Sequence, residues 1–234
     1  MLLERHFFSI IVVEIIKIIV ILGGIKMINT SPLVITISRQ LGSGGAYVGQ
    51  QLAKNLNIYY ADREIIIQAA QKLSQLEEKL EARDEKLTSF WQACLQSCAY
   101  CSPDAYLPPQ FFVPTDQELF KAEADVIQHI AKESSAIIIG RCGGHILRNH
   151  PNHISIFLHG AFESRKIRVQ NLYNVSSAEA EKMIIKSDKE RARHYHTHTG
   201  KDWTDSRQYD ISIDTSKIGL DKSVKLILKY IEIN

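Results

Sequence analysis

The sequence LVITISRQLGSGGA, residues 33–46, decides how the rest of the chain is interpreted. Residues 33–37 are a mostly apolar run, which predicts a strand buried on both faces of a sheet. A turn with three glycines follows and leads into residues 47–56, where apolar side chains recur at helical spacing. A glycine-rich turn between a buried strand and a helix lets backbone N–H groups converge on an anion at the helix N-terminus. The stretch therefore predicts a phosphate site.

Short apolar runs alternate with longer amphipathic stretches along the remaining chain. Strands are expected at residues 33–37, 58–60, 136–139, 154–158 and 211–213, and helices at 47–56, 63–80 and 222–233. Because the strands are continuously apolar, we expect a mostly parallel five-stranded sheet in a three-layer α/β/α arrangement. Two excursions are expected: an irregular insertion at about 87–114, with three cysteines and four of the six prolines, and a helical, basic segment at about 162–207.

Composition excludes several classes of protein. The 234 residues are 45% hydrophobic and 23% charged, which is typical of a globular chain. The net charge of +2, from 28 basic and 26 acidic residues, predicts no nucleic-acid partner. Four unevenly spread cysteines do not make a disulfide framework, so we expect a reducing, cytoplasmic location.

Residues 1–27 form an apolar N-terminal extension ahead of a domain at 28–234. Its run at 7–25 is long enough for a bilayer, but Glu14 and Lys17 lie within it. Each ionised group at mid-membrane costs ~2.5–3.5 kcal/mol on insertion scales. Three interpretations stay open: a translation start at Met27, which we favour, a membrane anchor, and an extra packed helix. Membrane association is expected only through 7–25.

The glycine turn fits the mononucleotide P-loop pattern G-x-x-x-x-G-K-[ST] only in part. With Gly44 as the second glycine, Arg39 replaces the first glycine, Gly45 the lysine and Ala46 the hydroxyl residue. The pattern therefore fails at its most informative positions.

The dinucleotide pattern G-x-G-x-x-G also fits in part. Gly42 and Gly44 match it, but Tyr47 stands in the third place. Asp62, 20 residues after Gly42, suits an acid that binds a ribose. On the turn alone, a mononucleotide site and the dinucleotide site of an NAD-type oxidoreductase stay open.

Five segments in order resemble the cytidylate kinase-like family, a branch of the P-loop nucleoside monophosphate kinases. They are ITISRQLGSGG at 35–45, YAD at 60–62, IGRCG at 139–143, DKERA at 188–192 and YDISIDTS at 209–216. The resemblance implies a P-loop kinase fold in which the insertion binds the acceptor and the segment 162–207 forms a helical lid. It implies ATP and Mg²⁺ as cofactors. The implied substrate is a small nucleotide, a CMP- or dCMP-like monophosphate or a similar acceptor.

The resemblance also assigns roles to residues. The donor phosphates would be held by Gly42, Ser43, Gly44, Gly45 and Ala46, and the donor base would lie near Thr215 and Ser216. The acceptor would be bound by Asp62, Arg141, Asp188 and Arg191, with Arg165 and Arg168 as arginines of the lid. Phosphoryl transfer needs in-line positioning and positive charge, and arginine binds phosphate bidentately and stays ionised.

One departure bears on the activity. Without the P-loop lysine and hydroxyl, the donor loses a point charge and Mg²⁺ loses a ligand; the related branch shares the missing lysine. Arg39 is the nearest residue of the turn that could supply the charge, and Ser43 or Asp62 could reach the ion. Two functions therefore remain: a kinase, and a nucleotide-binding regulatory protein with weak or no transfer. The oligomeric state is not indicated.

Two cysteine and histidine patterns are set aside, and no metal-binding residues are expected. Cys94, Cys98 and Cys101 have the spacing of an iron–sulfur site, but they lie in a strand-poor stretch mid-chain. His194, His196 and His198 alternate, which would put them on one side of an extended backbone, but we expect a solvent-exposed loop.

Overall fold

The computed structural model describes residues 31–62, 66 and 117–233. Within them, five strands form one sheet in the order β2-β3-β1-β4-β5. The strands are β1 (Val34–Arg39), β2 (Tyr59–Ala61), β3 (Ala136–Ile139), β4 (His153–His159) and β5 (Ile211–Asp214). Every described pairing is parallel, and the central β1 sets Val34 beside Ala136 of β3 and His153 of β4. The five predicted strands are thus confirmed.

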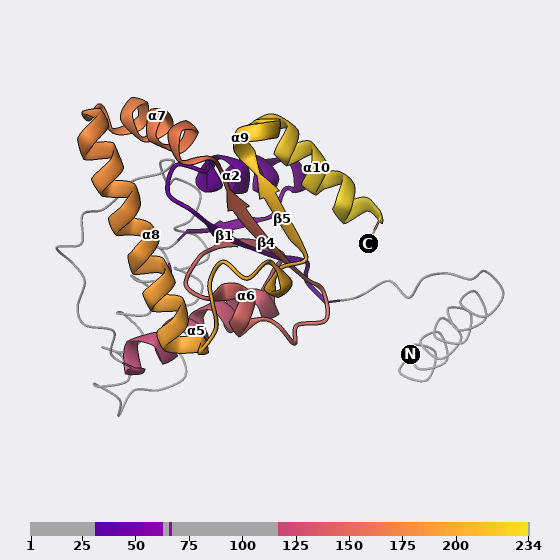
Figure 1. Ribbon diagram of the computed structural model, residues 1–234. Helices are drawn as coiled ribbons and strands as arrows, with labels where there is room; N and C mark the ends of the chain where they lie inside the picture. Colours follow the sequence, from indigo (N-terminus) through magenta and orange to yellow (C-terminus); the bar gives the residue numbers. More distant parts are fainter. Residues whose placement is uncertain (1–30, 63–65, 67–116, 234) are drawn as a thin grey trace, which may run out of the picture. The chain divides into compact units, whose positions relative to one another are not determined.

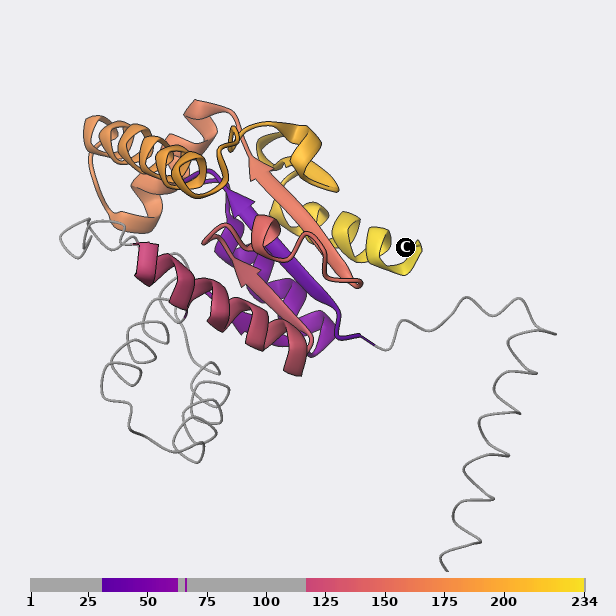
Figure 2. The same cartoon turned by 90° about the horizontal axis from the view of Figure 1, so that it is seen from below.

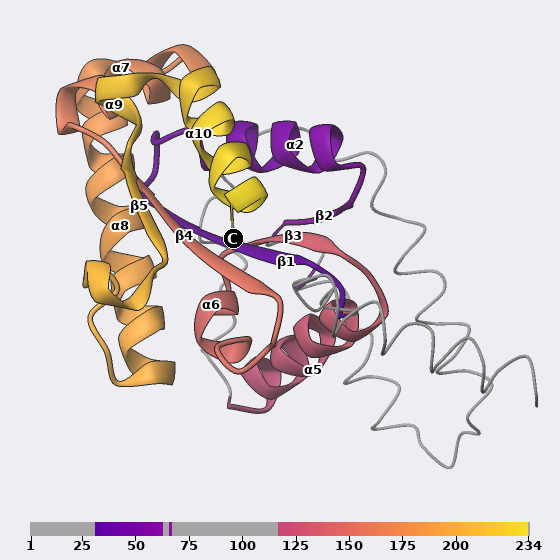
Figure 3. The ribbon, with the colours of Figure 1, turned by 90° about the vertical axis from the view of Figure 1, so that its right-hand side faces the viewer.

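Helices cover both faces of the sheet, as Figures 1 and 3 show. One face carries α2 (Gly45–Leu56) and α10 (Leu220–Ile233), and the other carries α5 (Gln117–Glu133) and α6 (Gly143–Ile146). The remaining elements are α7 (Phe162–Tyr173), α8 (Ser177–Thr199), η3 (Ser206–Gln208) and α9 (Thr215–Ile218). The three-layer α/β/α fold is confirmed, and the sheet is parallel throughout.

The alternation of side chains along β1 builds both halves of the core. Val34 packs with apolar residues of α5, whereas Ile35 and Ile37 pack with those of α2 and α10. All three side chains are fully buried. Because successive residues of a strand point to opposite faces, a strand covered on both sides is apolar along most of its length.

The predicted helical segment at 162–207 consists mainly of α7 and α8. The α8 helix begins after an N-cap residue, Ser176, whose hydroxyl accepts from the Glu179 N–H at 3.2 Å. It continues to Thr199, so the prediction of an exposed histidine loop is wrong. His194 and His198 stand one turn apart, and His196 is exposed.

Several predictions fall outside the described residues. They concern the N-terminal run at 7–25, nearly all of the helix at 63–80, the insertion at 87–114 and the cysteines 94, 98 and 101. The chain divides into two compact units, Met1–Ser31 and Pro32–Asn234, and the described elements belong to the second. Among the described residues, no helix has the length and apolarity needed to cross a bilayer.

Candidate active site

The glycine turn lies at the carboxyl edge of the sheet, the usual place for a ligand in parallel α/β folds. Figure 2 shows the strand arrows pointing toward the side where α7 and α8 lie. Gly42 has φ 78° and Gly44, which caps α2, has φ 79°. Both values are left-handed and favour glycine, because an L side chain is strained there. The two glycines turn the chain from β1 directly into α2.

The first turn of α2 offers donors for an anion. The helical bonding begins with Val48 N–H, which donates to Gly44 O at 3.0 Å. The preceding N–H groups, of Gly45, Ala46 and Tyr47, have no acceptor within the helix. They also stand at the positive end of the helix dipole. The predicted donor-phosphate residues Gly45 and Ala46 therefore lie where a phosphate group fits.

Three arginines hold the carbonyl groups of the same turn. The bonds run from Arg191 Nη1 to Arg39 O at 2.7 Å, from Arg165 Nη1 to Leu41 O at 3.0 Å, and from Arg168 Nη1 to Gly42 O at 3.0 Å. A peptide plane that directs its C=O to one side directs its N–H to the other. The arginines of α7 and α8 therefore fix the orientation of the turn.

Asp188 joins this arrangement from the middle of α8. One carboxylate oxygen accepts from Leu41 N–H at 2.9 Å, and the other accepts from Arg165 Nη1 at 2.7 Å. The Arg165 side chain, 7% exposed, also donates through Nε to Gly160 O at 3.0 Å. The structure brings Asp188 and Arg191, predicted to bind the acceptor, together at the turn with Arg165 and Arg168, predicted to be arginines of the lid.

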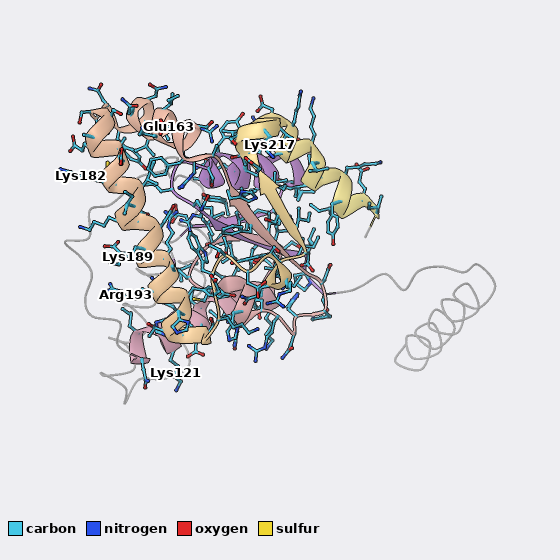
Figure 4. All side chains as sticks on the ribbon, viewed as in Figure 1. Lys121, Glu163, Lys182, Lys189, Arg193 and Lys217 are labelled. Carbon is cyan, nitrogen blue, oxygen red and sulfur yellow. The ribbon has the colours of Figure 1, made fainter. Side chains whose placement is uncertain are left out.

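The outer surface of α8 has a different character. Lys182, Lys189 and Arg193 point away from the sheet in Figure 4, and all three are exposed. Asp188 and Arg191 lie on the face that contacts the turn. One face of α8 therefore forms hydrogen bonds to the glycine turn, and another face exposes basic side chains to solvent.

Thr215 and Ser216, predicted to lie near the donor base, have hydrogen bonds inside the fold. Thr215 is 2% exposed, and its hydroxyl lies 2.9 Å from Ser43 O and 3.1 Å from His159 O. The Ser216 hydroxyl accepts from Ala161 N–H at 3.1 Å and donates to Asp214. Hydrogen bonding from Ser216 lowers the pKa of the Asp214 carboxyl. The bond of Thr215 to Ser43 O therefore joins those of the three arginines in holding the carbonyl groups of the turn.

Ser43 and Asp62 were the candidates for a magnesium ligand. The Ser43 side chain is fully buried, and its hydroxyl donates to Gln40 O at 2.8 Å. It is turned into the protein and does not fit the role of a metal ligand. Asp62 directly follows β2 and remains the candidate, since Mg²⁺ in kinase sites is usually held by one or two carboxylates and the substrate phosphates.

Arg141 lies in the loop after β3 and is anchored by a residue that the sequence analysis missed. Its Nε donates to Glu123 Oε2 at 2.8 Å, and its Nη2 contacts Oε1. Glu123 is fully buried on α5. A signal did exist, because Glu123 shares a helical face with the buried Val126, Ile127 and Ile130. An acid on an apolar face needs a buried cation.

The neighbours of Arg141 are apolar and aromatic. Burial raises the pKa of the Cys142 thiol to about 12, which keeps it protonated and unreactive. His198 stacks on Phe120 with ring centroids 3.8 Å apart. Burial and the positive charge of Arg141 lower the pKa of His198. The Arg141 guanidinium therefore lies in a rigid, poorly solvated environment.

A parallel sheet in this order, with a glycine turn leading from its central strand into a helix and arginines over that turn, defines a P-loop kinase fold. The chain belongs to the Cytidylate kinase-like family, which it matches over residues 34–217. The resemblance drawn from the five sequence segments is thereby confirmed.

Individual proteins show the same likeness. The cytidylate kinase of Sulfurisphaera tokodaii is 24% identical over 207 residues, which is 85% of this chain and 95% of the relative. A cytidylate kinase of Saccharolobus islandicus is 28% identical over 108 residues, 46% of this chain and 57% of the relative. The solved structure of an uncharacterised Eubacterium ventriosum protein has a TM-score of 0.65 and 27% identity, covering 86% of this chain and 99% of that one.

Proposed function

We propose that this protein is an ATP-dependent phosphotransferase that acts on a nucleoside monophosphate, CMP- or dCMP-like, or on a similar small acceptor. The observation that carries the proposal is the glycine turn: its carbonyl groups are held by three arginines while the first amides of α2 remain as donors. Two relatives named cytidylate kinases support the acceptor class.

Each group of residues has its own role in the proposed reaction. The amides of Gly45 and Ala46 bind the donor phosphates, and Asp188 with the arginines of α7 and α8 keeps the turn in that shape. ATP would supply the phosphoryl group and Mg²⁺ would neutralise its phosphates, with Asp62 as the acid assigned to the ion. Arg141, which follows the neighbouring strand and is ion-paired with the buried Glu123, is assigned to the acceptor side. Preorganised charge of this kind is the main source of catalysis in phosphoryl transfer.

A second function is favoured by Gly45 and Ala46. These residues provide backbone amides but neither the lysine nor the hydroxyl of the P-loop pattern. A protein that binds nucleotide through amides alone would bind ATP and transfer phosphate poorly. Such a protein would act as a nucleotide-dependent regulator.

ADP release from Mg·ATP, measured against a panel of nucleoside monophosphates, separates the two functions. A kinase releases ADP with one acceptor far faster than with none. Arg168→Gln removes the donor that holds Gly42 O, so the turn should be misplaced and ADP release about 10²-fold slower. Lys182→Gln, on the exposed face of α8, is the matched control and should leave the rate unchanged. ATP binding without acceptor-dependent release supports the regulator instead.

A further inference from the structure

Gly45 and Gly140 come from different parts of the chain, and one side chain fills the space beside both. A Cβ atom placed on Gly45 would lie 2.6 Å from Cγ of Arg39 and 2.8 Å from its Cβ. A Cβ atom on Gly140 would overlap Nη1 of the same arginine. Arg39 therefore runs from the end of β1, past the first residue of α2, to the loop after β3.

Close approach is the reason for the glycine at position 45. Gly140 has φ 76°, so its backbone alone favours glycine. Gly45 opens α2 and is not among the residues with positive φ. Any side chain at position 45, a lysine included, would begin inside the space that Arg39 occupies. Unbonded carbons prefer a separation of roughly 3.5–4 Å.

Position 45 is the place of the lysine in the P-loop pattern. From the exclusion of side chains there by Arg39, we infer that Arg39 supplies from β1 the positive charge that a P-loop lysine supplies from the helix. The guanidinium group ends beside Gly140, the residue before Arg141, and so lies between the donor amides and the acceptor side. The inference rests on the proposed function and names a further residue for the reaction.

The step needs no proton from Arg39. An oxygen of the acceptor phosphate forms a bond to the γ-phosphorus of ATP. The bond from that phosphorus to the β–γ bridging oxygen breaks, and the oxygen leaves with the electron pair as part of ADP. Negative charge develops on the γ-phosphoryl and bridging oxygens, where a guanidinium can donate two parallel hydrogen bonds. Arginine keeps its charge throughout because a guanidinium group stays ionised in proteins.

The test moves the charge back to the helix. The single variants are Arg39→Gly and Gly45→Lys, and the double variant carries both. Arg39→Gly should lower kcat/KM for Mg·ATP about 10²-fold, as removal of a transition-state donor does. Gly45→Lys alone should also be impaired, since its Cβ meets Arg39. The double variant should recover at least about tenfold over Arg39→Gly, because Arg39→Gly clears the space beside position 45 and the lysine there restores the positive charge.

Calorimetric binding of ATP and AMP provides a readout that does not depend on turnover. Arg39→Gly should weaken ATP about tenfold and leave AMP unchanged, since AMP has no β- or γ-phosphate. Arg39→Lys, which keeps a charge in place, should lie between the wild type and Arg39→Gly. Arg148→Gln, at an exposed residue in the turn before β4, is the control in both assays.

The outcomes separate this inference from the proposed function. Turnover and ATP affinity of Arg39→Gly within about threefold of wild type would overturn the inference and leave the kinase intact. A double variant no better than Arg39→Gly would also overturn it. If the wild type turns over no acceptor, yet Arg39→Gly loses affinity for ATP and not for AMP, the inference holds and the proposed function fails.

Discussion

Asp188 binds two groups, and the protein would lose stability if either were buried without a partner. Its carboxylate accepts the Leu41 N–H and neutralises the nearly buried Arg165, whose other donors bind backbone carbonyls. Removing one partner of such an ion pair destabilises a protein more than the absence of both partners, because the remaining charge stays buried without a counter-charge. The pair therefore connects the stability of α7 and α8 to the shape of the phosphate-binding turn.

Asp188→Asn should lower the free energy of unfolding by about 3 kcal/mol, since it leaves Arg165 without its counter-charge. The KM for ATP should rise in the same variant, because the turn loses one of its supports. Urea denaturation and initial rates measure the two effects. Lys166→Met is the control: Lys166 pairs with the exposed Glu163 on the same helix, and such pairs contribute less than ~1 kcal/mol. Equal losses in both variants would contradict the assignment.

His153 predicts how stability depends on pH. Burial lowers the pKa of its imidazole to about 4, and the Thr36 hydroxyl lies 2.8 Å from Nε2. The ordinary pKa of histidine is about 6.5, so the unfolded state binds the proton that the folded state refuses. The free energy of unfolding should therefore fall as pH drops from about 6.5 to about 4. The full contribution is on the order of 3 kcal/mol.

Urea titrations at pH 7 and pH 4.5 measure this dependence. His153→Gln should lose less stability between the two pH values than the wild type does. His196→Gln, at an exposed position on α8, should behave like the wild type. A His153→Gln variant with the wild-type pH dependence would show that another group is responsible.

The long helix α8 contacts the rest of the fold at two places. Its middle contacts the glycine turn through Asp188 and Arg191. Its carboxyl end packs into a mostly aromatic cluster, called here the anchor cluster, which consists of Cys142, Phe157, Tyr195, Trp203 and Tyr209. Trp203 meets Phe157 edge-on at 5.5 Å, and the Tyr209 hydroxyl donates to Trp203 O at 2.8 Å. The anchor cluster therefore positions the helix against β4.

Trp203→Ala should destabilise the protein by about 3–5 kcal/mol, the usual cost of removing a buried aromatic side chain. The ATP affinity of the remaining folded protein should also weaken, because α8 is less firmly held over the turn. Thermal unfolding and calorimetry read the two effects. Leu172→Ala, half exposed on α7, should change neither by much. Loss of stability with unchanged ATP affinity would show that the anchor cluster does not position the turn.

For the whole molecule, the sheet was predictable and the hydrogen bonding at its edge was not. Apolar runs predicted all five strands because a strand covered on both faces is mostly apolar; the buried Thr36 and Ser155 are small polar exceptions. The sequence also indicated which arginines matter, but not that they bind backbone carbonyls. The pairing of Arg141 with Glu123 spans 18 residues and depends on how α5 packs. The histidine prediction failed because His194 and His198 lie on a helix and pack against Phe120 of α5, a contact between distant segments that the alternation of histidines does not reveal.

Nucleotide binding should stabilise the whole fold. At about 100 times its Kd, Mg·ATP adds ~2.7 kcal/mol, which raises the Tm of a domain of this size by roughly 5–10 °C. NAD⁺ at the same concentration should not raise the Tm, because the glycine turn fits a mononucleotide kinase. Thermal shift measurements with both ligands test this. A larger shift with NAD⁺ would favour the oxidoreductase alternative.

A kinase of this kind must transfer the phosphoryl group without the P-loop lysine. The most direct measurement follows both products of Mg·ATP and CMP or dCMP by ³¹P NMR. We expect ADP and the acceptor's nucleoside diphosphate in equal amounts, with Arg39→Gly much slower. ADP accompanied by inorganic phosphate, with the monophosphate unchanged, would contradict it. That result would leave a nucleotide-binding protein that hydrolyses ATP without an acceptor.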